Sequence, residues 1–237
     1  MSKAFVSWSG GKDCCLACYN ARADGWEICY LASMITEHTG RLWPHYLTPD
    51  VLRMQAKAMG IPIVQRWTTV PDYRQEYIDM LQSLKQKGIT AGIFGDVKNG
   101  NELADEHRRW VEDVCSTSGI NTRLPLWNKG REAILNEFIE AGFEAIIIAS
   151  DKDRLGEEWL GRRLNRGLLN ELKARYELSP DGDVGYYHTF VVDGPLFNKR
   201  LEIQEANPVL KGPIWYLDIL RCGLVEKAGV GSLRAES

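Results

Sequence analysis

The chain has 237 residues, of which 44% are apolar and 26% are charged, so it can bury a large core in one or two domains. Its formal net charge of -3 gives no overall basic field of the kind that nucleic-acid-binding proteins carry. No apolar run approaches the roughly 18 residues that a membrane-spanning helix needs, and no signal-type segment precedes the first predicted strand. We therefore expect a cytoplasmic protein with no membrane partner and do not expect it to bind nucleic acid.

The first predicted element is a strand over residues 4–8, which leads into the turn Ser9-Gly10-Gly11-Lys12-Asp13 and then into a helix that ends near Asp24. Backbone N–H groups of such a turn converge with the helix N-terminus on one point, where the helix dipole favours negative charge. The two glycines let a phosphate approach the backbone, and Lys12 adds a positive charge. The stretch therefore predicts a phosphate-binding site.

The next hundred residues alternate between predicted strands and helices. Strands are expected over residues 27–35, 61–67 and 91–94, and helices over 48–59, 72–87 and 102–118. This alternation predicts an α/β fold with a doubly wound parallel sheet, in which ligands bind beyond the carboxyl ends of the strands. Gly95 and Asp96 follow a strand, so we expect them at the same edge as the glycine turn. The polar loop over residues 36–48, which contains His45, is expected to face a ligand.

A second, smaller α/β unit is predicted beyond a short strand and boundary near residues 120–128. Its helices are expected over residues 131–141 and 157–175, and its strands over 144–150, 188–192, 201–203 and 214–220. The pattern predicts domains over residues 1–125 and 126–225. The small and polar residues 226–237 are expected to form a flexible tail.

The six cysteines do not have the pattern of a secreted disulfide framework, since three of them fall in one predicted helix. Cys15 and Cys18 have the CxxC spacing of redox and metal sites. No second cysteine pair or histidine cluster completes a metal site, so small buried side chains on a core helix are the favoured interpretation. A redox or metal protein is an alternative that predicts reactive thiols or bound zinc or iron.

The glycine turn is neither a Walker A loop nor a Gly-x-Gly-x-x-Gly dinucleotide loop. It resembles the Ser-Gly-Gly-x-Asp-Ser/Thr loop of the N-type ATP pyrophosphatases (PP-loop proteins), with Cys14 in place of the final hydroxyl residue. In that family a substrate oxygen attacks the α-phosphate of ATP, AMP joins the substrate and pyrophosphate leaves. The resemblance implies that Lys12 and the helix N-terminus stabilise the leaving pyrophosphate and that Asp13 holds magnesium.

Several later segments together resemble the diphthine–ammonia ligase family. They are Phe94-Gly-Asp-Val97, Glu106-His-Arg-Arg-Trp-Val-Glu-Asp-Val-Cys115, Pro125-Leu-Trp127, Glu140-Ala-Gly-Phe-Glu-Ala145, Trp159-Leu-Gly-Arg162 and Thr189-Phe-Val-Val-Asp-Gly-Pro-Leu-Phe197. The resemblance covers Lys3 to about Ile203. It implies an adenine nucleotide alpha hydrolase-like, Rossmann-like fold with an ATP-binding domain over residues 1–125 and a substrate-binding domain over 126–225. The implied activity is adenylation of the diphthine carboxylate on elongation factor 2, followed by amidation with ammonium.

One segment departs from the ligase branch of that family. It reads Asp183-Val-Gly-Tyr-Tyr-His-Thr189, where the ligase branch has a sequence like Glu-Gly-Gly-Glu-Tyr-Glu-Thr. The His-Thr ending resembles a bacterial branch for which a role in cobalamin salvage has been suggested. The acceptor is therefore left open between a protein-borne acid, a small acid related to cobalamin and a tRNA base. Free ammonium or a small amine is the expected nitrogen donor, because the sequence holds no glutaminase domain, and a homodimer is left open.

The expected site falls into two groups of residues. ATP and pyrophosphate are expected to bind Ser7, Ser9, Gly10, Gly11, Lys12, Asp13, Cys14, Gly95 and Asp96. The acceptor is expected to bind His45, Glu106, Arg109, Asp183, Tyr186, Tyr187 and His188. Lys12, Asp13 and His188 are the expected catalytic residues, and Asp13 is the expected magnesium ligand.

Three of the candidate positions have alternative interpretations. Asp96 could serve the nucleotide or a metal, or the N-terminus of the next helix. His188 could act as a base near neutral pH or make a single structural hydrogen bond within a strand. His107 falls on the apolar stripe of the helix over 102–118 and is expected to be a core histidine. At the level of function, a nucleotide-binding regulatory module that binds ATP without turnover is the non-enzyme alternative.

Overall fold

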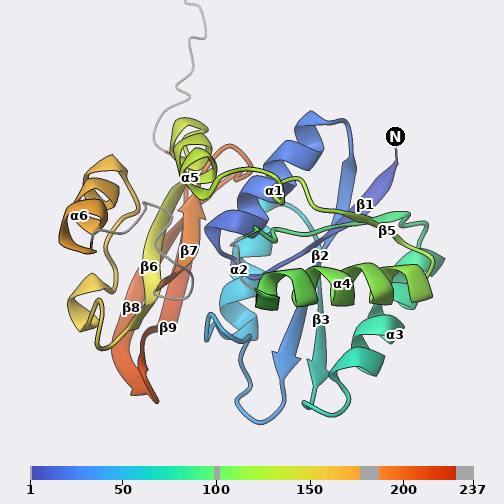
Figure 1. Ribbon diagram of the computed structural model, residues 1–237, viewed down its shortest axis with the longest axis horizontal. Helices are drawn as coiled ribbons and strands as arrows, with labels where there is room; N and C mark the ends of the chain where they lie inside the picture. The colour runs from blue at the N-terminus through green and yellow to red at the C-terminus, as the bar shows by residue number, and fades with distance from the viewer. Residues whose placement is uncertain (1, 99–101, 177–186, 228–237) are drawn as a thin grey trace, which may run out of the picture.

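The computed structural model describes residues 2–98, 102–176 and 187–227. A parallel sheet from the first half of the chain lies beside an antiparallel sheet from the second half, and helices pack around both (Figure 1). Among the helices formed by the described residues, none combines the length and the apolar character needed to cross a membrane.

The parallel sheet has five strands. They are β1 (Lys3–Ser7), β2 (Glu27–Thr36), β3 (Ile63–Thr68), β4 (Ala91–Ile93) and β5 (Asn121–Arg123). They lie in the order β3-β2-β1-β4-β5, and every neighbouring pair is parallel. The chain therefore winds outward from β1 in both directions, which confirms the predicted doubly wound sheet and places its switch point between β1 and β4.

Helices cover both faces of this sheet. Two of them, α1 (Lys12–Ala23) and α2 (Pro49–Met59), share a core with one face, while α3 (Tyr73–Gln86) and α4 (Glu102–Thr117) share a core with the other. The start of α2 follows local rules, because the Thr48 side chain accepts a hydrogen bond from the backbone N–H of Val51 and Pro49 occupies the first turn. The helix ends at Gly60, which has the left-handed conformation that favours glycine.

The second sheet has four strands in the order β7-β6-β9-β8, and all its pairings are antiparallel. Its strands are β6 (Glu144–Asp151), β7 (Tyr187–Asp193), β8 (Arg200–Lys211) and β9 (Ile214–Val225), and its helices are α5 (Arg131–Glu140), α6 (Arg166–Tyr176) and the short 3-10 helix η1 (Glu157–Trp159). The strands predicted over 201–203 and 214–220 are parts of one long hairpin.

The helix predicted over residues 157–175 is wrong in its first half. Only η1 and α6 are helical there, and between them the chain turns at Gly161, which has a φ of 76°. Arg163 then forms a β-bridge with Ile146, so this segment joins the sheet before α6 begins. The apolar side chains of Trp159, Leu160 and Leu164 imitate a helical stripe, although Trp159 ends η1 and the other two lie in the non-helical segment that follows it.

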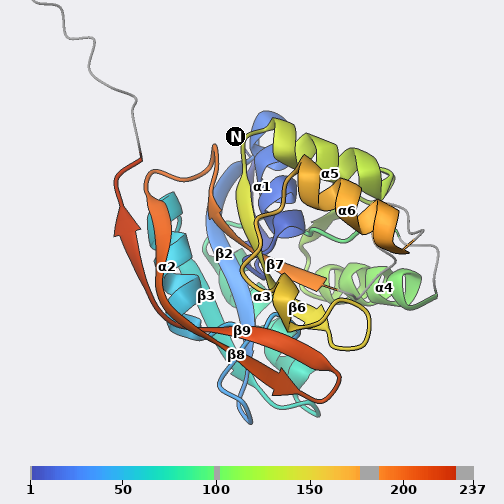
Figure 2. The ribbon, with the colours of Figure 1, turned by 90° about the vertical axis from the view of Figure 1, so that its left-hand side faces the viewer.

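The two sheet units share one continuous core. Buried side chains from β1, α1 and α2 belong to the same apolar cluster as those from α5, β6 and β7. The backbone N–H of Val191 in β7 donates to the carbonyl of Gly10, and the N–H of Asn198 donates to the carbonyl of Ala58. Figure 2 shows the β8–β9 hairpin beside α2, which it contacts. The second unit is therefore packed directly onto the glycine turn of the first.

Candidate active site

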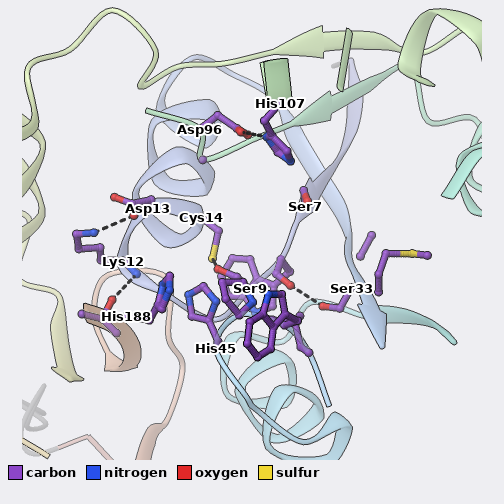
Figure 3. A pocket seen from close by; sticks show the side chains of 18 of the residues that line it. Ser7, Ser9, Lys12, Asp13, Cys14, Ser33, His45, Asp96, His107 and His188 are labelled. Carbon is purple, nitrogen blue, oxygen red and sulfur yellow. Dashed lines mark hydrogen bonds and ion pairs between the residues drawn. The ribbon is translucent and has the colours of Figure 1, made fainter. Parts of the chain in front are cut away.

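A cavity of about 340 Å³ opens at the carboxyl-terminal edge of the parallel sheet (Figure 3). Among the residues predicted to form the site, those that line it are Ser7, Ser9, Lys12, Asp13, Cys14, His45, Gly95, Asp96, Tyr187 and His188. Further residues that line it were not predicted, and they include Ser33, Met34, Tyr73, Tyr77, His107 and Thr189. The cavity thus collects residues from β1, β2, α1, α3, α4 and β7 and from the loops that follow β1, β2 and β4.

Both glycines of the turn are closely packed. Gly10 has a φ of 80°, and a Cβ placed there would lie 2.9 Å from Oε1 of Gln55. A Cβ on Gly11 would lie 2.8 Å from Nε2 of His45 and 3.1 Å from the carbonyl oxygen of Thr189. The contacts with Gln55 and His45 are shorter than real Cβ atoms show, so the packing of the turn favours glycine at both positions. Neither glycine is among the residues that line the cavity.

The side chain of Lys12 lines the cavity and stays positively charged at neutral pH although it is partly buried. Burial lowers the pKa of Lys12, but the Asp13 carboxylate and the Tyr187 ring raise it by more, so the pKa lies above its ordinary value. The Nζ atom of Lys12 lies 2.9 Å from the Asp13 carboxylate and 5.7 Å from the centroid of the Tyr187 ring. The loop therefore presents a cation at the N-terminus of α1, where an anion is favoured.

Cys14 occupies the position of the missing hydroxyl residue. Its Sγ accepts a hydrogen bond from Oγ of Ser9 at 3.5 Å and donates one to the carbonyl of Gly11 at 3.2 Å. Burial raises the pKa of the Cys14 thiol, yet hydrogen bonds from Cys15 and from Ser9 outweigh this effect and leave the pKa lowered. The thiol thus fills the hydrogen-bonding place of a hydroxyl at the base of the loop.

Cys15 and Cys18 are buried thiols. Burial raises the pKa of Cys15 well above its ordinary value and that of Cys18 to about 12, so neither becomes a thiolate at neutral pH. Within the described part of the chain, no group of three histidine, cysteine or acidic side chains is arranged to hold a metal ion. These observations favour the interpretation of both cysteines as core residues.

A network of hydrogen bonds holds the glycine turn between α2 and β7. The backbone N–H of Lys12 donates to Oγ1 of Thr189 at 3.1 Å. The side-chain amide of Gln55 donates to the carbonyls of Gly10 and Val191, at 3.0 and 2.7 Å, and accepts from the indole N–H of Trp8 at 2.8 Å. Sequence reasoning missed Thr189 and Gln55, although a lone polar residue on the buried face of α2 is a signal for such a role.

Two histidines meet beside Lys12. The rings of His45, from the loop after β2, and His188, from β7, lie with their centroids 4.6 Å apart. Burial lowers the pKa of both side chains and the nearby Lys12 charge lowers them further, to about 4 for His188. His45 is also lowered by His188, and its Nδ1 has no hydrogen-bond partner among the described residues. Both rings are therefore neutral at neutral pH and can accept hydrogen bonds.

The loop that carries His45 is fixed by the second unit. The Arg41 guanidinium makes two hydrogen bonds to the Asp218 carboxylate of β9, at 2.8 and 2.9 Å, and one to the carbonyl of Tyr46 at 3.0 Å. The Tyr46 ring packs against Tyr216, with ring centroids 4.8 Å apart. Strand β9 therefore helps to set the position of His45 in the cavity.

Asp96 is paired with a histidine. Gly95 packs so closely on the start of α1 that a Cβ there would lie 2.7 Å from the Asp13 carbonyl carbon and the Cys14 nitrogen. The next residue, Asp96, is hydrogen-bonded through Oδ1 to Nδ1 of His107. This bond raises the pKa of His107 against the opposing effect of burial.

The prediction that His107 is a core residue is wrong. Its side chain is 57% exposed, because the first turns of α4 extend beyond the sheet and the buried face of the helix begins only at Val111. Leu103, one turn earlier on the same predicted stripe, is 72% exposed. His107 lies instead at the rim of the cavity, where it meets Asp96 (Figure 3).

Two predicted acceptor-binding residues are not brought into the cavity, and two more cannot be placed because they fall outside the described part of the chain. Glu106 and Arg109 lie exposed on α4 and are not among the side chains that line it. Asp183 and Tyr186 lie outside the described residues. The predicted tail begins at Glu226, and here Glu226 pairs with Lys199, while Lys227 pairs with Asp193.

Comparisons with known proteins agree along most of the chain. Residues 2–122 match the family model for the diphthamide synthase N-terminal domain, and residues 130–225 match that for the diphthamide synthase C-terminal domain. The chain is 28% identical over 247 residues to the diphthine–ammonia ligase of Mus musculus, covering 92% of this chain and 91% of that protein. It is also 28% identical over 232 residues to the diphthine–ammonia ligase of Schizosaccharomyces pombe, of which it spans only 38% while 90% of this chain is covered. A solved structure of a predicted tRNA methyltransferase subunit from Methanocaldococcus jannaschii matches 82% of this chain and 98% of its own, with 17% identity and a TM-score of 0.45.

Proposed function

The chain belongs to the diphthamide synthase family of ATP-dependent ligases, and from this premise we propose that it activates a carboxylate with ATP and joins the activated acid to ammonia or a small amine. The observation that carries the proposal is the glycine turn, of which Ser9, Lys12 and Asp13 line the cavity and Lys12 supplies a cationic side chain. His45 and His188 line another part of the same cavity, so an acceptor can lie beside the nucleotide.

In the first step, an oxygen of the acid attacks the α-phosphate of ATP. The new bond joins that oxygen to phosphorus, and the bond from the α-phosphate to the β-phosphate breaks, so pyrophosphate leaves with the electron pair. The charge that develops on pyrophosphate is stabilised by Lys12 and by the N-terminus of α1. Thr189 holds the backbone of Lys12, so the clamp depends on both units of the chain.

The donor chemistry at the loop fits magnesium. Mg²⁺ is usually bound by one or two carboxylates together with substrate phosphates and waters. Asp13 supplies a carboxylate in the first turn of α1, beside the proposed phosphate site and partly open to the cavity. We assign magnesium binding to Asp13, where the ion would neutralise charge on the phosphates.

We assign the acceptor to the side of the cavity formed by His45, Tyr187 and His188. At the level of domains, we assign ATP binding to residues 1–125 and most of the acceptor contacts to residues 126–225. His188 stands where the ligase branch resembled by this sequence has a glutamate, and its pKa of about 4 keeps it neutral. A glutamate wall suits a cationic acceptor such as diphthine, whereas neutral imidazoles beside Lys12 suit an acid without that cation. A small acid related to cobalamin is therefore the second candidate acceptor.

Release of pyrophosphate in the presence of candidate acids tests the proposal. The panel contains diphthine on elongation factor 2 and small acids related to cobalamin, each with ATP, magnesium and ammonium. We expect AMP and pyrophosphate from one acid, and formation of ADP and phosphate would overturn the adenylation chemistry. A regulatory module would bind ATP with no turnover for any acid.

The loop assignment is tested by Asp13→Ala, with Asp24→Ala at the other end of α1 as the matched control. Asp24 is exposed and lies away from the cavity, so its variant should keep full turnover. The Asp13 variant should lose turnover while its circular dichroism stays unchanged. Equal turnover in the two variants would contradict the assignment.

A further inference from the structure

A carboxylate–imidazole pair lies on the side of the cavity opposite His45 and His188 (Figure 3). It consists of Asp96, just beyond β4, and His107 of α4, and the mechanism above leaves both without a role. The pair lies close to the phosphate loop, because Gly95, the residue before Asp96, packs on the peptide between Asp13 and Cys14.

The orientation of the His107 ring is fixed from two directions. Its Nδ1 is hydrogen-bonded to Oδ1 of Asp96, so Nε2 is the ring nitrogen left to exchange a proton with the cavity. Its face stacks on Trp110, with centroids 5.9 Å apart and an interplanar angle of 24°. Trp110 is in turn held by Tyr77, whose ring centroid lies 5.1 Å away. A carboxylate that orients an imidazole through Nδ1 is the arrangement of a general base.

Resting on the ligase function proposed above, we propose that His107 is the base that takes a proton from the incoming ammonium or amine, and that Asp96 is its positioning residue. Ammonium is the nitrogen source present at neutral pH, and it has no lone pair until it loses a proton. The Asp96 carboxylate places negative charge next to the imidazole, which attracts the cation to this side of the cavity.

The reaction balances as follows. Ammonium gives one proton to Nε2 of His107, and the resulting ammonia attacks the acyl carbon of the adenylate. The C–N bond forms and the C–O bond to AMP breaks, so AMP leaves with the electron pair. The nitrogen then loses a second proton, which His107 accepts after it has released the first to solvent. That release is open because the His107 side chain is 57% exposed.

The other two cavity histidines are poorer candidates for this step. His45 and His188 lie beside the Lys12 cation, which disfavours both a bound ammonium and a protonated imidazole there. The groups around His107 are different. They are Asp96 after β4, Tyr73 and Tyr77 of α3, and, across the cavity, Lys12 and Asp13 of α1. Of these, Asp96 makes the direct hydrogen bond, and it raises the pKa of His107.

The proposal is tested by comparing two nucleophiles in His107→Gln, Asp96→Asn and the control His38→Gln. His38 is an exposed histidine outside the cavity. The enzyme is supplied with ATP and the acid that gives pyrophosphate release in the wild type, and then with either ammonium or hydroxylamine. Hydroxylamine is already neutral at neutral pH, so it needs no base to become a nucleophile.

We expect His107→Gln to lower ammonium-dependent amide formation about 100-fold, the scale of general-base catalysis. The first-turnover burst of pyrophosphate, which precedes the amine step, and hydroxamate formation should stay at the wild-type level. Asp96→Asn should lower the pKa of His107, so the alkaline rise of the ammonium-dependent rate should move to lower pH and reach a lower plateau. The control should match the wild type throughout.

Each remaining outcome decides the matter. If His107→Gln slows both nucleophiles equally, or neither, His107 is not the base, and the ligase function stands without it. If the ammonium-dependent pH profile is the same in Asp96→Asn and the wild type, Asp96 does not position the base. If no acid gives pyrophosphate release in the wild type, the proposed function fails and this assignment fails with it.

Discussion

The three histidines that line the cavity have pKa values shifted in opposite directions. Burial lowers the pKa of His45 and His188, whereas the Asp96 carboxylate raises the pKa of His107. At neutral pH one wall is therefore formed by neutral imidazoles beside Lys12, and the other carries an imidazole that is more readily protonated. Such a separation suits a site that binds an anion at one side and handles a cationic nucleophile at the other.

The buried histidines predict a loss of stability in acid. His188 has a pKa near 4 in the folded chain and an ordinary value of 6.5 when unfolded, so the unfolded chain binds the proton more tightly between these values. The free energy of unfolding should therefore fall as the pH drops from 6.5 towards 4. In His188→Gln, the melting temperature should fall less over this interval, as measured by circular dichroism. If the melting temperatures of the wild type and of His188→Gln fall by the same amount over this interval, His188 does not titrate in this way.

Replacing Gly10 by alanine should destabilise the fold by more than the strain of its positive φ alone. Gly10 and Gly25 have similar φ values, 80° and 84°, but a Cβ on Gly10 would meet Gln55 at 2.9 Å, whereas nothing lies within 4 Å of one on Gly25. Alanine at either position carries the strain of a positive φ, and only at Gly10 does it add overpacking, which costs about 1–3 kcal/mol. Urea unfolding should show Gly10→Ala to be the less stable variant by that amount. Equal stabilities would exclude the crowding.

At the scale of elements, the parallel sheet could be predicted because its strands leave a strong trace in the sequence. β1 is buried on both faces, so its sequence is a continuous apolar run. The helix α1 follows it, and residues Cys14 to Cys18 of that helix are all buried. Glycines such as Gly60 mark the helix ends. The position of the glycine turn at the carboxyl edge could be predicted because alternating strands and helices make a parallel sheet, whose strands all end at that edge.

The hairpin and α4 could not be predicted as well, and the reason is physical. β8 and β9 are half-exposed strands with few fully buried residues, such as Leu201 and Tyr216, so only their most apolar portions are visible as strands. α4 has a helical period throughout, but the period does not say where the sheet beneath it ends. The period therefore predicts a core position for His107, although the side chain is 57% exposed because the buried face of the helix begins only at Val111.

The polar partners of the glycine turn were invisible for a different reason. Gln55 and Thr189 act through contacts with residues far away in the sequence, 45 positions from Gly10 in one case and 177 from Lys12 in the other. The position of Gln55 on the buried face of α2 and the segment that begins at Thr189 can be recognised in the sequence, but neither identifies the partner of the side chain. Only the packing of α2 and β7 against the loop shows what they bind.

Gln55 predicts a large effect for one buried amide. Its replacement by methionine keeps a similar shape but leaves the Trp8 indole N–H and the Val191 carbonyl without their partner. Each buried polar group left unpaired costs about 1–3 kcal/mol, so Gln55→Met should lose on the order of 3 kcal/mol in urea unfolding. Gln75→Met, at an exposed site on α3, is the matched control and should change stability by less than about 0.5 kcal/mol. A Gln55 variant as stable as the control would mean that water replaces the amide.

At the scale of the whole molecule, the candidate site is a product of the contact between the two units. The N-terminal unit supplies the glycine turn, but the turn reaches its form only with Thr189 on the Lys12 amide and Val191 on the Gly10 carbonyl. The loop that carries His45 is fixed through Arg41 to Asp218 of β9. Neither unit alone therefore holds the complete arrangement, and the continuous core packs the two units together around it.

A shared core predicts a single cooperative unfolding unit. The apolar cluster joins β1, α1 and α2 to α5, β6 and β7, so opening either sheet exposes surface that the other one buries. Hydrogen exchange followed by mass spectrometry should give the slowest amides of β1 and of β7 the same free energy of opening. Gln55→Met should lower the free energy of opening equally for both strands. The hydrogen bonds that it removes, from the Gln55 side-chain amide to the carbonyls of Gly10 and Val191, lie where the two units meet. Opening of β7 at a lower free energy than β1 would instead mean that the second unit detaches on its own, leaving the glycine turn without Thr189.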